Sequence, residues 1–562
     1  MTAGFDRRAM LAGTGAVTGA GLWRPANAQN AAYDTLSTLT TGPYVAVETA
    51  NGRLRGGHSR GALAFKGIPY AGPVGGGNRF KAPPPPVSWT GVRDALVLGP
   101  PAIQPPHTTY GENEAGYSEN CLVLNVWTPA CDGKRRPVMF YNHGGGYATG
   151  SAGSRGQDGA HLAATHDVVV VAGNHRLGLL GYLYLGELGG EAYATSGNQG
   201  LLDIVAALRW VKTNIAAFGG DPGNVMLFGE SGGGFKTGSL LAMPAARGLF
   251  HKASIESGPA LRRMPKANAT ETARRVLKGL GLRPDELHRL ADIPAQAILD
   301  IQVAGNSGPL GTPSGPGAPV TPAGGPAHAA GWESEQPGGF GPVVDGTVLP
   351  MHPFDPAATP LAADIPLLIG NNRDEARFFF MGDPAVFTLD EAGLKARMAA
   401  FGPDAARILE VYRRTRPHAT PGELYIAAVT ARSMGFNTIR IADRKAAQPA
   451  PVYRYRCDYE SNHAIPGTDT TLGAGHATEI TLKFLADDQP GLEGNGPTLA
   501  PAARNMSALW ASFARTGVPS APGQPAWPRY DTKTRATMLI DARCRVENDP
   551  DGAERELWQE QS

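Results

Sequence analysis

The chain has 562 residues, of which 51 are lysine or arginine and 50 are aspartate or glutamate, so its formal net charge is +1. Because it contains no block of basic residues, the composition argues against nucleic-acid binding and against attachment to an anionic membrane surface. The length suits one large α/β unit with insertions, and we expect a monomer whose partners are neutral or weakly polar.

The first 28 residues have the features of an export signal. Arg7 and Arg8 precede a weakly apolar stretch at residues 9–23, and an Ala-Asn-Ala triplet at 26–28 offers small residues for cleavage. The paired arginines indicate the twin-arginine route and predict a periplasmic or secreted protein, with a disordered tail as the alternative. No other run is long and apolar enough to span a bilayer.

The next segment predicts a β-hairpin, followed by a series of buried strands. YVAVETANGRLRGG alternates around Asn51-Gly52, which is a strong hairpin signal. The later apolar runs are too short for helices and too apolar for strands with one solvent-exposed face. We therefore expect a large, mostly parallel central sheet with an N-terminal antiparallel hairpin and helices on both faces. The runs cover residues 122–127, 137–142, 167–174, 224–229, 252–258, 365–372 and 452–459.

A glycine-rich segment, YNHGGGYATG (141–150), follows the second of these runs and matches the HGGG-type motif. Backbone N–H groups stabilise the oxyanion that forms when a nucleophile attacks a carbonyl, provided that no side chain blocks the approach. We expect Gly145 and Gly146 to donate from this segment.

The clearest helix is expected from about Gln199 to Phe218, and it leads into the strand before a second glycine motif. Gly229-Glu230-Ser231-Gly232-Gly233 matches the G-x-S-x-G nucleophile elbow, whose sharp turn exposes the serine hydroxyl above the sheet. The spacing alone is a weak signal in a chain with 74 glycines, so its context must support it. Further helices are expected near 269–281, 388–400, 421–445 and 501–516.

Residues 305–340 interrupt this pattern. Nearly half of them are glycine or proline, which leaves too little apolar content for a core. We expect a surface insertion in a single domain that spans residues 29–562; a lid over a pocket is the alternative.

A serine nucleophile needs a base, and the base needs an acid to hold its tautomer. In elbow-type hydrolases these groups follow the serine in the order acid, histidine. Asp374 and Glu375 lie just beyond the run 365–372, at the edge where open α/β sheets place their active sites. His476 lies on a glycine-bearing loop before an expected helix. The residues alone do not choose between the two carboxylates.

Two other histidines, His463 and His143, are alternatives to His476 as the base. His463 lies near His476 in the sequence but lacks the glycine loop and the following helix. His143 precedes the serine, and we expect it to shape the glycine segment instead.

Taken together, these motifs resemble the type B carboxylesterase and lipase family, which includes the cholinesterases, and especially its bacterial para-nitrobenzyl-type members. The similarity covers most of residues 44–531 in family order. It implies the α/β-hydrolase fold and a serine carboxylesterase that uses a Ser-His-Glu triad, an acyl-enzyme intermediate and water, with no cofactor or metal. The stretches include LAFKGIPYAGP, SENCLVLNVWTP, NHGGGY, FGESGG, GPVVDGTVLP, GNNRDEARFF and GAGHATEI.

The resemblance also assigns roles. It implies Ser231 as the nucleophile, Glu375 as the acid and His476 as the base. It implies N–H donation to the oxyanion by Gly145, Gly146 and Gly232, the last of which stands where the family usually has alanine. Glu230 is implied to be a buried carboxylate that tunes the site, with a purely structural role as the alternative, and Ser257 is implied to hydrogen-bond near the acid.

Several alternatives stay open. A lipase, an amidase or an acyltransferase would use the same fold, and a non-catalytic binding homologue would use it without chemistry. The sequence does not specify the acyl or alcohol group of the substrate.

The chain has four cysteines, which an oxidising compartment would favour as disulfides. Cys457 and Cys544 lie in or beside strand-like segments, so we expect these two to pair. By the family resemblance, the partner of Cys121 would fall near Ala102, so Cys121 is expected to be free.

Overall fold

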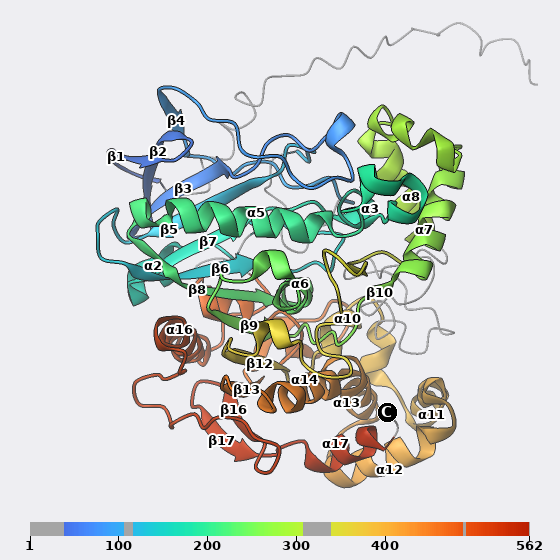
Figure 1. Ribbon diagram of the computed structural model, residues 1–562. Helices are drawn as coiled ribbons and strands as arrows, with labels where there is room; N and C mark the ends of the chain where they lie inside the picture. Colours follow the sequence, from blue (N-terminus) through green and yellow to red (C-terminus); the bar gives the residue numbers. More distant parts are fainter. Residues whose placement is uncertain (1–38, 106–115, 155, 307–338, 487–490, 561–562) are drawn as a thin grey trace, which may run out of the picture.

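A thirteen-stranded sheet crosses the described part of the chain, which in this computed structural model is residues 39–105, 116–154, 156–306, 339–486 and 491–560 (Figure 1). The export signal predicted at 1–28 and most of the insertion predicted at 305–340 lie outside these residues. The strands are β1 (Leu39–Thr49), β2 (Gly52–Ser59), β3 (Ala62–Pro69), β4 (Val92–Asp94), β5 (Val123–Thr128), β6 (Arg136–Asn142), β7 (Val169–Gly173), β8 (Gly220–Glu230), β9 (Lys252–Glu256), β12 (Leu367–Asn372), β13 (Val452–Cys457), β16 (Ala536–Ile540) and β17 (Arg545–Asn548).

The centre of the sheet is parallel and its two ends are antiparallel. In the order β7-β6-β8-β9-β12-β13-β16 every neighbouring pair is parallel. β1, β2, β3 and β5 extend one end in antiparallel fashion, with the short β4 parallel to β2, and β17 closes the other end. The expected mostly parallel sheet is therefore confirmed. The N-terminal hairpin is also confirmed, although its two loop residues are Ala50 and Asn51, one position earlier than predicted.

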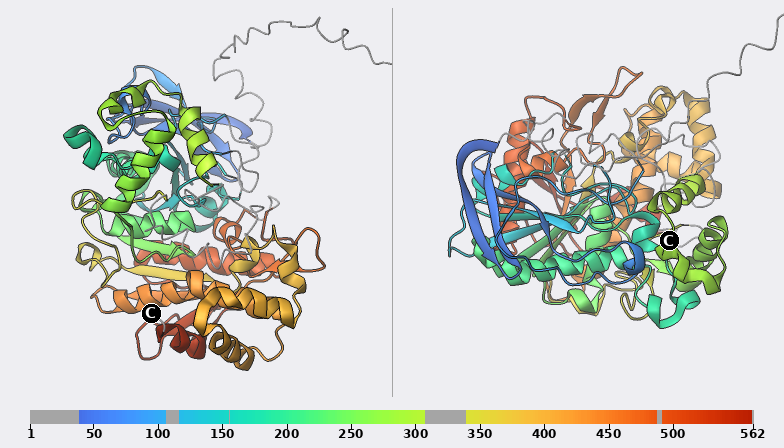
Figure 2. Two further views of the ribbon diagram at one scale, coloured as in Figure 1. Left: turned by 90° about the vertical axis from the view of Figure 1, so that its right-hand side faces the viewer. Right: turned by 90° about the horizontal axis from the view of Figure 1, so that it is seen from above.

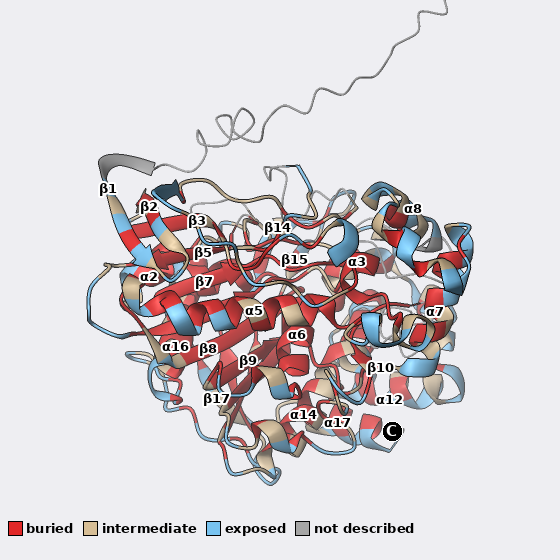
Figure 3. Ribbon diagram, turned by 45° about the horizontal axis from the view of Figure 1, so that its top comes forward, coloured by how far each residue is buried: buried red, intermediate tan, exposed pale blue. Residues whose placement is uncertain are grey.

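Alternate residues of the central strands enter two separate cores. Val169 and Val171 of β7 face one core, while Val170 faces the other, so the strand is buried on both faces as its apolar run predicted. Figure 3 shows the central strands as almost wholly buried. Helices α5 (Gln199–Asn214) and α6 (Gly232–Leu241) cover the first core. Helices α2 (Ala160–His166), α15 (Ile480–Phe484) and α16 (Leu499–Thr516) cover the second.

A mainly helical region with its own core lies beside the carboxyl end of β12, where Figures 1 and 2 show its helices together with the C-terminal helix. Its α13 and α14 are joined by one turn of π-helix, so the single helix predicted near 421–445 is interrupted. The helices are α10 (Ala376–Phe379), α11 (Glu391–Met398), α12 (Ala405–Thr415), α13 (Pro421–Thr430), α14 (Phe436–Ala446) and α17 (Gly552–Gln559). The other predicted helices correspond to α5, α7 (Lys266–Gly279), α11 and α16.

The expected disulfide between Cys457 and Cys544 is wrong. All four cysteines are free. The register of β13 and β16 pairs Cys457 with Ile540, which places Cys544 four residues further along the chain, in the connection to β17. Cys121 is free, as predicted. None of the helices in the described residues combines the length and apolar character needed to cross a bilayer.

Candidate active site

Ser231 occupies the sharp turn between β8 and α6. The strand ends at Glu230 and the helix begins at Gly232, so the serine alone makes the turn. Its backbone has φ 55° and ψ −122°. This conformation is energetically unfavourable for any residue other than glycine, and it occurs where surrounding contacts enforce it. One such contact is the hydrogen bond from the Ser231 N–H to the Glu256 carbonyl, at 2.8 Å. The sequence expectation of a strand–serine–helix turn is confirmed.

The glycine segment after β6 packs directly against this turn. Gly145 and Gly146 have φ 81° and 60°, which favour glycine. A Cβ on Gly232 would lie 2.2 Å from the Gly146 carbonyl oxygen, and a Cβ on Gly233 would lie 1.9 Å from the Asn142 oxygen. The departure from the usual alanine at position 232 therefore allows an approach of the two backbones that a methyl group would prevent.

The carboxylate that follows β12 and the histidine that follows β13 meet at the same edge of the sheet. Glu375 and His476 are both buried, and His476 Nδ1 lies 2.6 Å from Glu375 Oε2. The other oxygen of Glu375 accepts hydrogen bonds from the Ser257 hydroxyl at 2.6 Å and from the Asn372 N–H at 2.7 Å. Asp374 instead pairs with Arg373 at 2.9 Å, so the geometry distinguishes the two adjacent carboxylates that the residue pattern left open.

The far nitrogen of His476 faces the serine turn. Nε2 lies 3.2 Å from Oε1 of Glu230, the residue immediately before the serine. Burial raises the pKa of the Glu230 carboxyl well above its usual value, and His476 only partly offsets this. Burial lowers the pKa of His476, but Glu230 and Glu375 more than offset that effect and raise it. The two groups therefore titrate as a pair that competes for a proton.

The other histidines lie elsewhere. His463 is in the short strand β14 (Ser461–Ala464), where its backbone N–H donates to Ser461 Oγ. His143 lies beneath the glycine segment with its ring stacked on His175, at 4.4 Å between centroids. The buried amine of Lys236, on α6, donates to the His143 carbonyl at 3.0 Å. These contacts indicate that His143 supports the glycine segment, as the sequence suggested.

Three buried charged residues near the site were not anticipated from the sequence: Glu256, Glu479 and Lys483. Each has a fully buried side chain. The available signal was a charged residue within a segment that also carries the apolar residues of a strand or helix, KASIESG for Glu256 and EITLKF for the other two. Among the described residues, no group of three or more histidine, cysteine, aspartate or glutamate side chains is placed to hold a metal ion.

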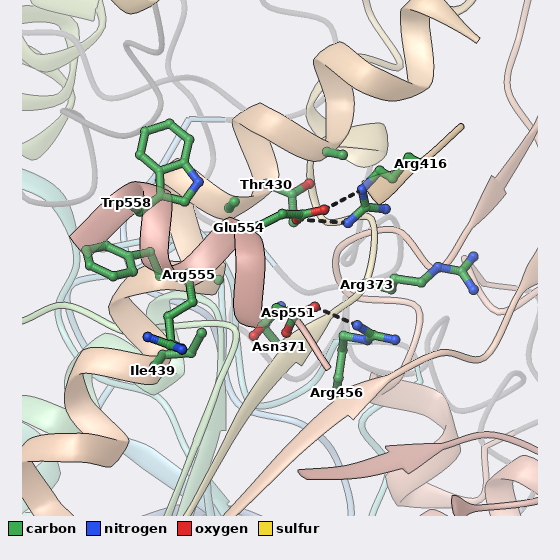
Figure 4. Close-up of a pocket in the computed structure, with 14 residues that line it drawn as sticks. Asn371, Arg373, Arg416, Thr430, Ile439, Arg456, Asp551, Glu554, Arg555 and Trp558 are labelled. Carbon is green, nitrogen blue, oxygen red and sulfur yellow. Dashed lines mark hydrogen bonds and ion pairs between the residues drawn. The ribbon is translucent and has the colours of Figure 1, made fainter. Parts of the chain in front are cut away.

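A separate polar pocket lies between the ends of β12 and β13 and helices α13, α14 and α17 (Figure 4). Asn371 of β12 lies in its wall. Asp551 pairs there with Arg456 at 2.6 Å, and Glu554 pairs with Arg416 at 2.9 Å. Neither Ser231 nor His476 lines this pocket, and its two ion pairs join the C-terminal helix α17 to β13 and to the end of α12.

Comparison with known proteins bears on the chemistry of this site. A model described as the carboxylesterase family matches residues 43–558. The chain is 36% identical over 518 residues to para-nitrobenzyl esterase of Bacillus subtilis (strain 168), covering 91% of this chain and 97% of that protein. It is 33% identical to phenmedipham hydrolase of Pseudarthrobacter oxydans, covering 88% and 94%. Among solved structures, carboxylesterase EST55 of Geobacillus stearothermophilus at pH 6.2 matches with a TM-score of 0.77 and 41% identity, covering 92% of this chain and all of that one.

Proposed function

The chain belongs to the carboxylesterase family and has its α/β-hydrolase fold, and from this premise we propose that Ser231, His476 and Glu375 carry out its ester hydrolysis. The protein is a serine carboxylesterase, a carboxylic ester hydrolase whose substrates are an ester and water. The observation that supports the assignment of residues is the placement of His476, with Nδ1 on Glu375 and Nε2 toward the turn that carries Ser231.

In the proposed mechanism His476 removes the proton from the Ser231 hydroxyl as the oxygen attacks the ester carbonyl. Glu375 holds the Nδ1 proton and stabilises the imidazolium that forms. The backbone N–H groups of Gly145, Gly146 and Gly232 stabilise the tetrahedral oxyanion. His476 then protonates the departing alcohol, and water repeats the cycle on the acyl-enzyme. The positive φ angles of the first two glycines and the close approach of the third support this arrangement.

The supporting residues act on these groups. Ser257 fixes the acid through its 2.6 Å hydrogen bond to Glu375. Glu230 tunes the proton affinity of His476 from 3.2 Å.

A fluorophosphonate probe tests the nucleophile directly, because it reacts with activated serines. We expect the wild-type protein to be labelled and Ser231→Ala to remain unlabelled. Ser239→Ala is a matched control: Ser239 is a buried serine of α6 whose hydroxyl donates to the Phe235 carbonyl, and this variant is expected to label like the wild type. Equal labelling of Ser231→Ala and wild type would reject the mechanism.

We further propose that the protein is exported. Arg7, Arg8 and the Ala-Asn-Ala triplet at 26–28 support a twin-arginine signal that is cleaved to leave a single catalytic domain at 29–562. Cell fractionation together with N-terminal sequencing tests this, and a pair of Arg→Lys substitutions at 7 and 8 is expected to retain the protein in the cytoplasm. An uncleaved cytoplasmic wild-type protein would contradict the proposal.

We also propose a monomer with no nucleic-acid partner, in line with a net charge of +1. Light scattering coupled to size exclusion tests the first part. A series of alkyl and aryl esters graded by acyl length would define the substrate, while activation at an oil interface or dependence on an added alcohol would identify a lipase or an acyltransferase.

A further inference from the structure

Lys483 lies at the centre of a buried charge cluster beneath the proposed active site. Its Nζ is 2.7 Å from Glu256 Oε2 and 3.2 Å from Glu479 Oε1, and all three side chains are fully buried. A buried ammonium ion is costly to desolvate unless partners compensate its charge, and here two carboxylates do so. No step of the proposed mechanism uses any of these three residues.

One arm of the cluster runs from Lys483 to the base. The second oxygen of Glu479 accepts a hydrogen bond from the Asn372 side chain at 2.7 Å. The Asn372 N–H donates in turn to Glu375 Oε1 at 2.7 Å, and Glu375 Oε2 contacts the imidazole of His476. Every group along this path is buried, so water does not screen a change of charge at one end from the other.

The other arm runs from Lys483 to the nucleophile. Glu256 is the last residue of β9, and its carbonyl accepts the hydrogen bond from the Ser231 N–H at 2.8 Å. Its carboxylate is held by Ser254 Oγ at 2.7 Å and by Trp510 Nε1 at 2.5 Å. The side chain paired with Lys483 therefore belongs to the residue that fixes the backbone of the serine turn.

The carboxyl groups around this site outnumber its cations, and Lys483 offsets part of their negative charge. The carboxyl groups that face it are Glu230 from β8, Glu256 from β9, Glu375 after β12 and Glu479 before α15. The cationic groups are His476, Lys483 and, on the glycine-segment side, Lys236. Burial lowers the pKa of Lys236 far below its usual value. Two further titratable groups, Tyr455 and Cys457, face the cluster from β13, and burial raises the pKa of both. Among the described residues, Lys483 is the one charged ammonium that contacts any of these carboxylates, and it contacts Glu256 and Glu479.

We propose that Lys483 is a positioning residue for ester hydrolysis, because it pairs with both Glu256 and Glu479 and thereby holds the base and the serine turn in place. This inference rests on the proposed roles of Ser231 and His476. Without the lysine, two buried carboxylates lose their counter-ion, and their negative potential favours the protonated, inactive imidazole. The variant should therefore need a higher pH to become active, and the hydrogen-bonded path to Glu375 should loosen.

The test uses Lys483→Met in the full chain, with kcat, KM and the pH profile of kcat/KM measured on a p-nitrophenyl ester. We expect kcat at pH 7 to fall about 10- to 100-fold with KM changed less than about threefold, and the acidic limb of kcat/KM to rise by about one pH unit. The double variant Lys483→Met/Glu256→Gln removes one negative charge with the positive one, and we expect it to recover most of the shift.

Glu256→Gln alone gives the opposite sign. The amide keeps an oxygen acceptor for Trp510 and Ser254 but removes one negative charge, so the acidic limb should move to lower pH. This variant keeps the test decisive if Lys483→Met does not fold. Lys445→Met is the matched control, because Lys445 is a buried lysine of α14 that donates to Gln448 Oε1 and to backbone carbonyls away from the site.

An unchanged pH profile in Lys483→Met, or an equal effect in Lys445→Met, would overturn the role of Lys483, as would a shift of Glu256→Gln to higher pH. If the fluorophosphonate labels Ser231→Ala and wild type equally, the proposed function fails instead. Normal labelling together with an unaffected lysine variant rejects only the present inference.

Discussion

The two sides of the proposed active site are held together by different kinds of contact. On the nucleophile side, the turn at Ser231 and the glycine segment touch through backbone atoms, with no space for even a methyl group at Gly232 or Gly233. On the acid–base side, Glu375 and His476 are held by side-chain hydrogen bonds and by a cluster of buried charges. Because the first side depends on shape and the second on charge, different kinds of substitution should disrupt them.

This difference has a physical basis. Backbone N–H groups that stabilise an oxyanion need close approach but no titration, and glycine provides that approach. A general base must exchange a proton near the working pH, and its proton affinity is set by the charges around it. We therefore expect volume changes to affect the nucleophile side at every pH, and charge changes to affect the acid–base side in a pH-dependent way.

The largest effect is expected when the base is removed. His476→Ala should lower kcat by about 10⁴- to 10⁶-fold, because Ser231 then has no proton acceptor. His463→Ala is the control and should retain activity. If the proposed triad acts as a unit, the double variant Ser231→Ala/His476→Ala should lose no more than either single variant, as measured by steady-state hydrolysis. Additive losses would contradict a shared mechanism.

A methyl group should disrupt the nucleophile side by volume alone. Gly233→Ala places a Cβ 1.9 Å from the Asn142 oxygen, so the glycine segment must move away from the serine turn. We expect kcat to fall about 100-fold with an unchanged shape of the pH profile. Gly77→Ala, which has open space around it, serves as the control. A loss of kcat in Gly233→Ala that depends on pH would contradict the distinction between the two sides.

A charge change should affect the acid–base side mainly at low pH. In Glu230→Gln the carboxylate that raises the pKa of His476 is gone, so that pKa falls and the imidazole stays unprotonated further into the acidic range. The acidic limb of kcat/KM should move to lower pH by about one unit. A movement to higher pH, or none, would show that Glu230 does not couple to the base.

The smallest effect on activity is expected outside both sides, in the polar pocket of Figure 4. Burial raises the pKa of Asp551, but Arg456 and Arg454 more than offset this and hold it at about 2. The folded pKa thus lies below the unfolded value, so the stabilisation is present above about pH 4 and is lost as the pH falls toward 2.

Asp551→Asn should therefore lower the free energy of unfolding at pH 7 by about 1 to 3 kcal/mol, with kcat changed less than about twofold. Chemical denaturation at pH 7 and pH 3 measures this, and the difference from wild type should shrink at the lower pH. A large loss of kcat without a loss of stability would place the pocket within the functional site.

Much of the fold follows from local pattern, whereas the charge cluster does not. The run at 167–174 predicted a strand buried on both faces because its valines leave no polar face. The glycines at 229–233 predicted a strand–serine–helix turn for a similarly local reason. By contrast, Lys483 pairs with Glu256 from a strand more than 200 positions away, and neither residue carries a local sign of its partner.

The wrong disulfide has the same origin. Cys457 and Cys544 do lie in or beside neighbouring strands, as predicted, but pairing depends on register, and the register places Ile540 opposite Cys457. Likewise, the choice of Glu375 over Asp374 came from family resemblance, and the contacts with His476 and Ser257 that distinguish the two carboxylates appear only in three dimensions.

The free thiols affect how the protein responds to unfolding and to oxidants. Burial raises the pKa of the Cys121 and Cys457 thiols, which keeps both in the unreactive neutral form while the chain is folded. Their protection is conformational instead of covalent, so it vanishes when the molecule opens. Dye labelling of Cys121 and Cys457, as distinct from the partly exposed Cys131, should then report global opening without any engineered label, and oxidants should trap opened molecules before they can refold.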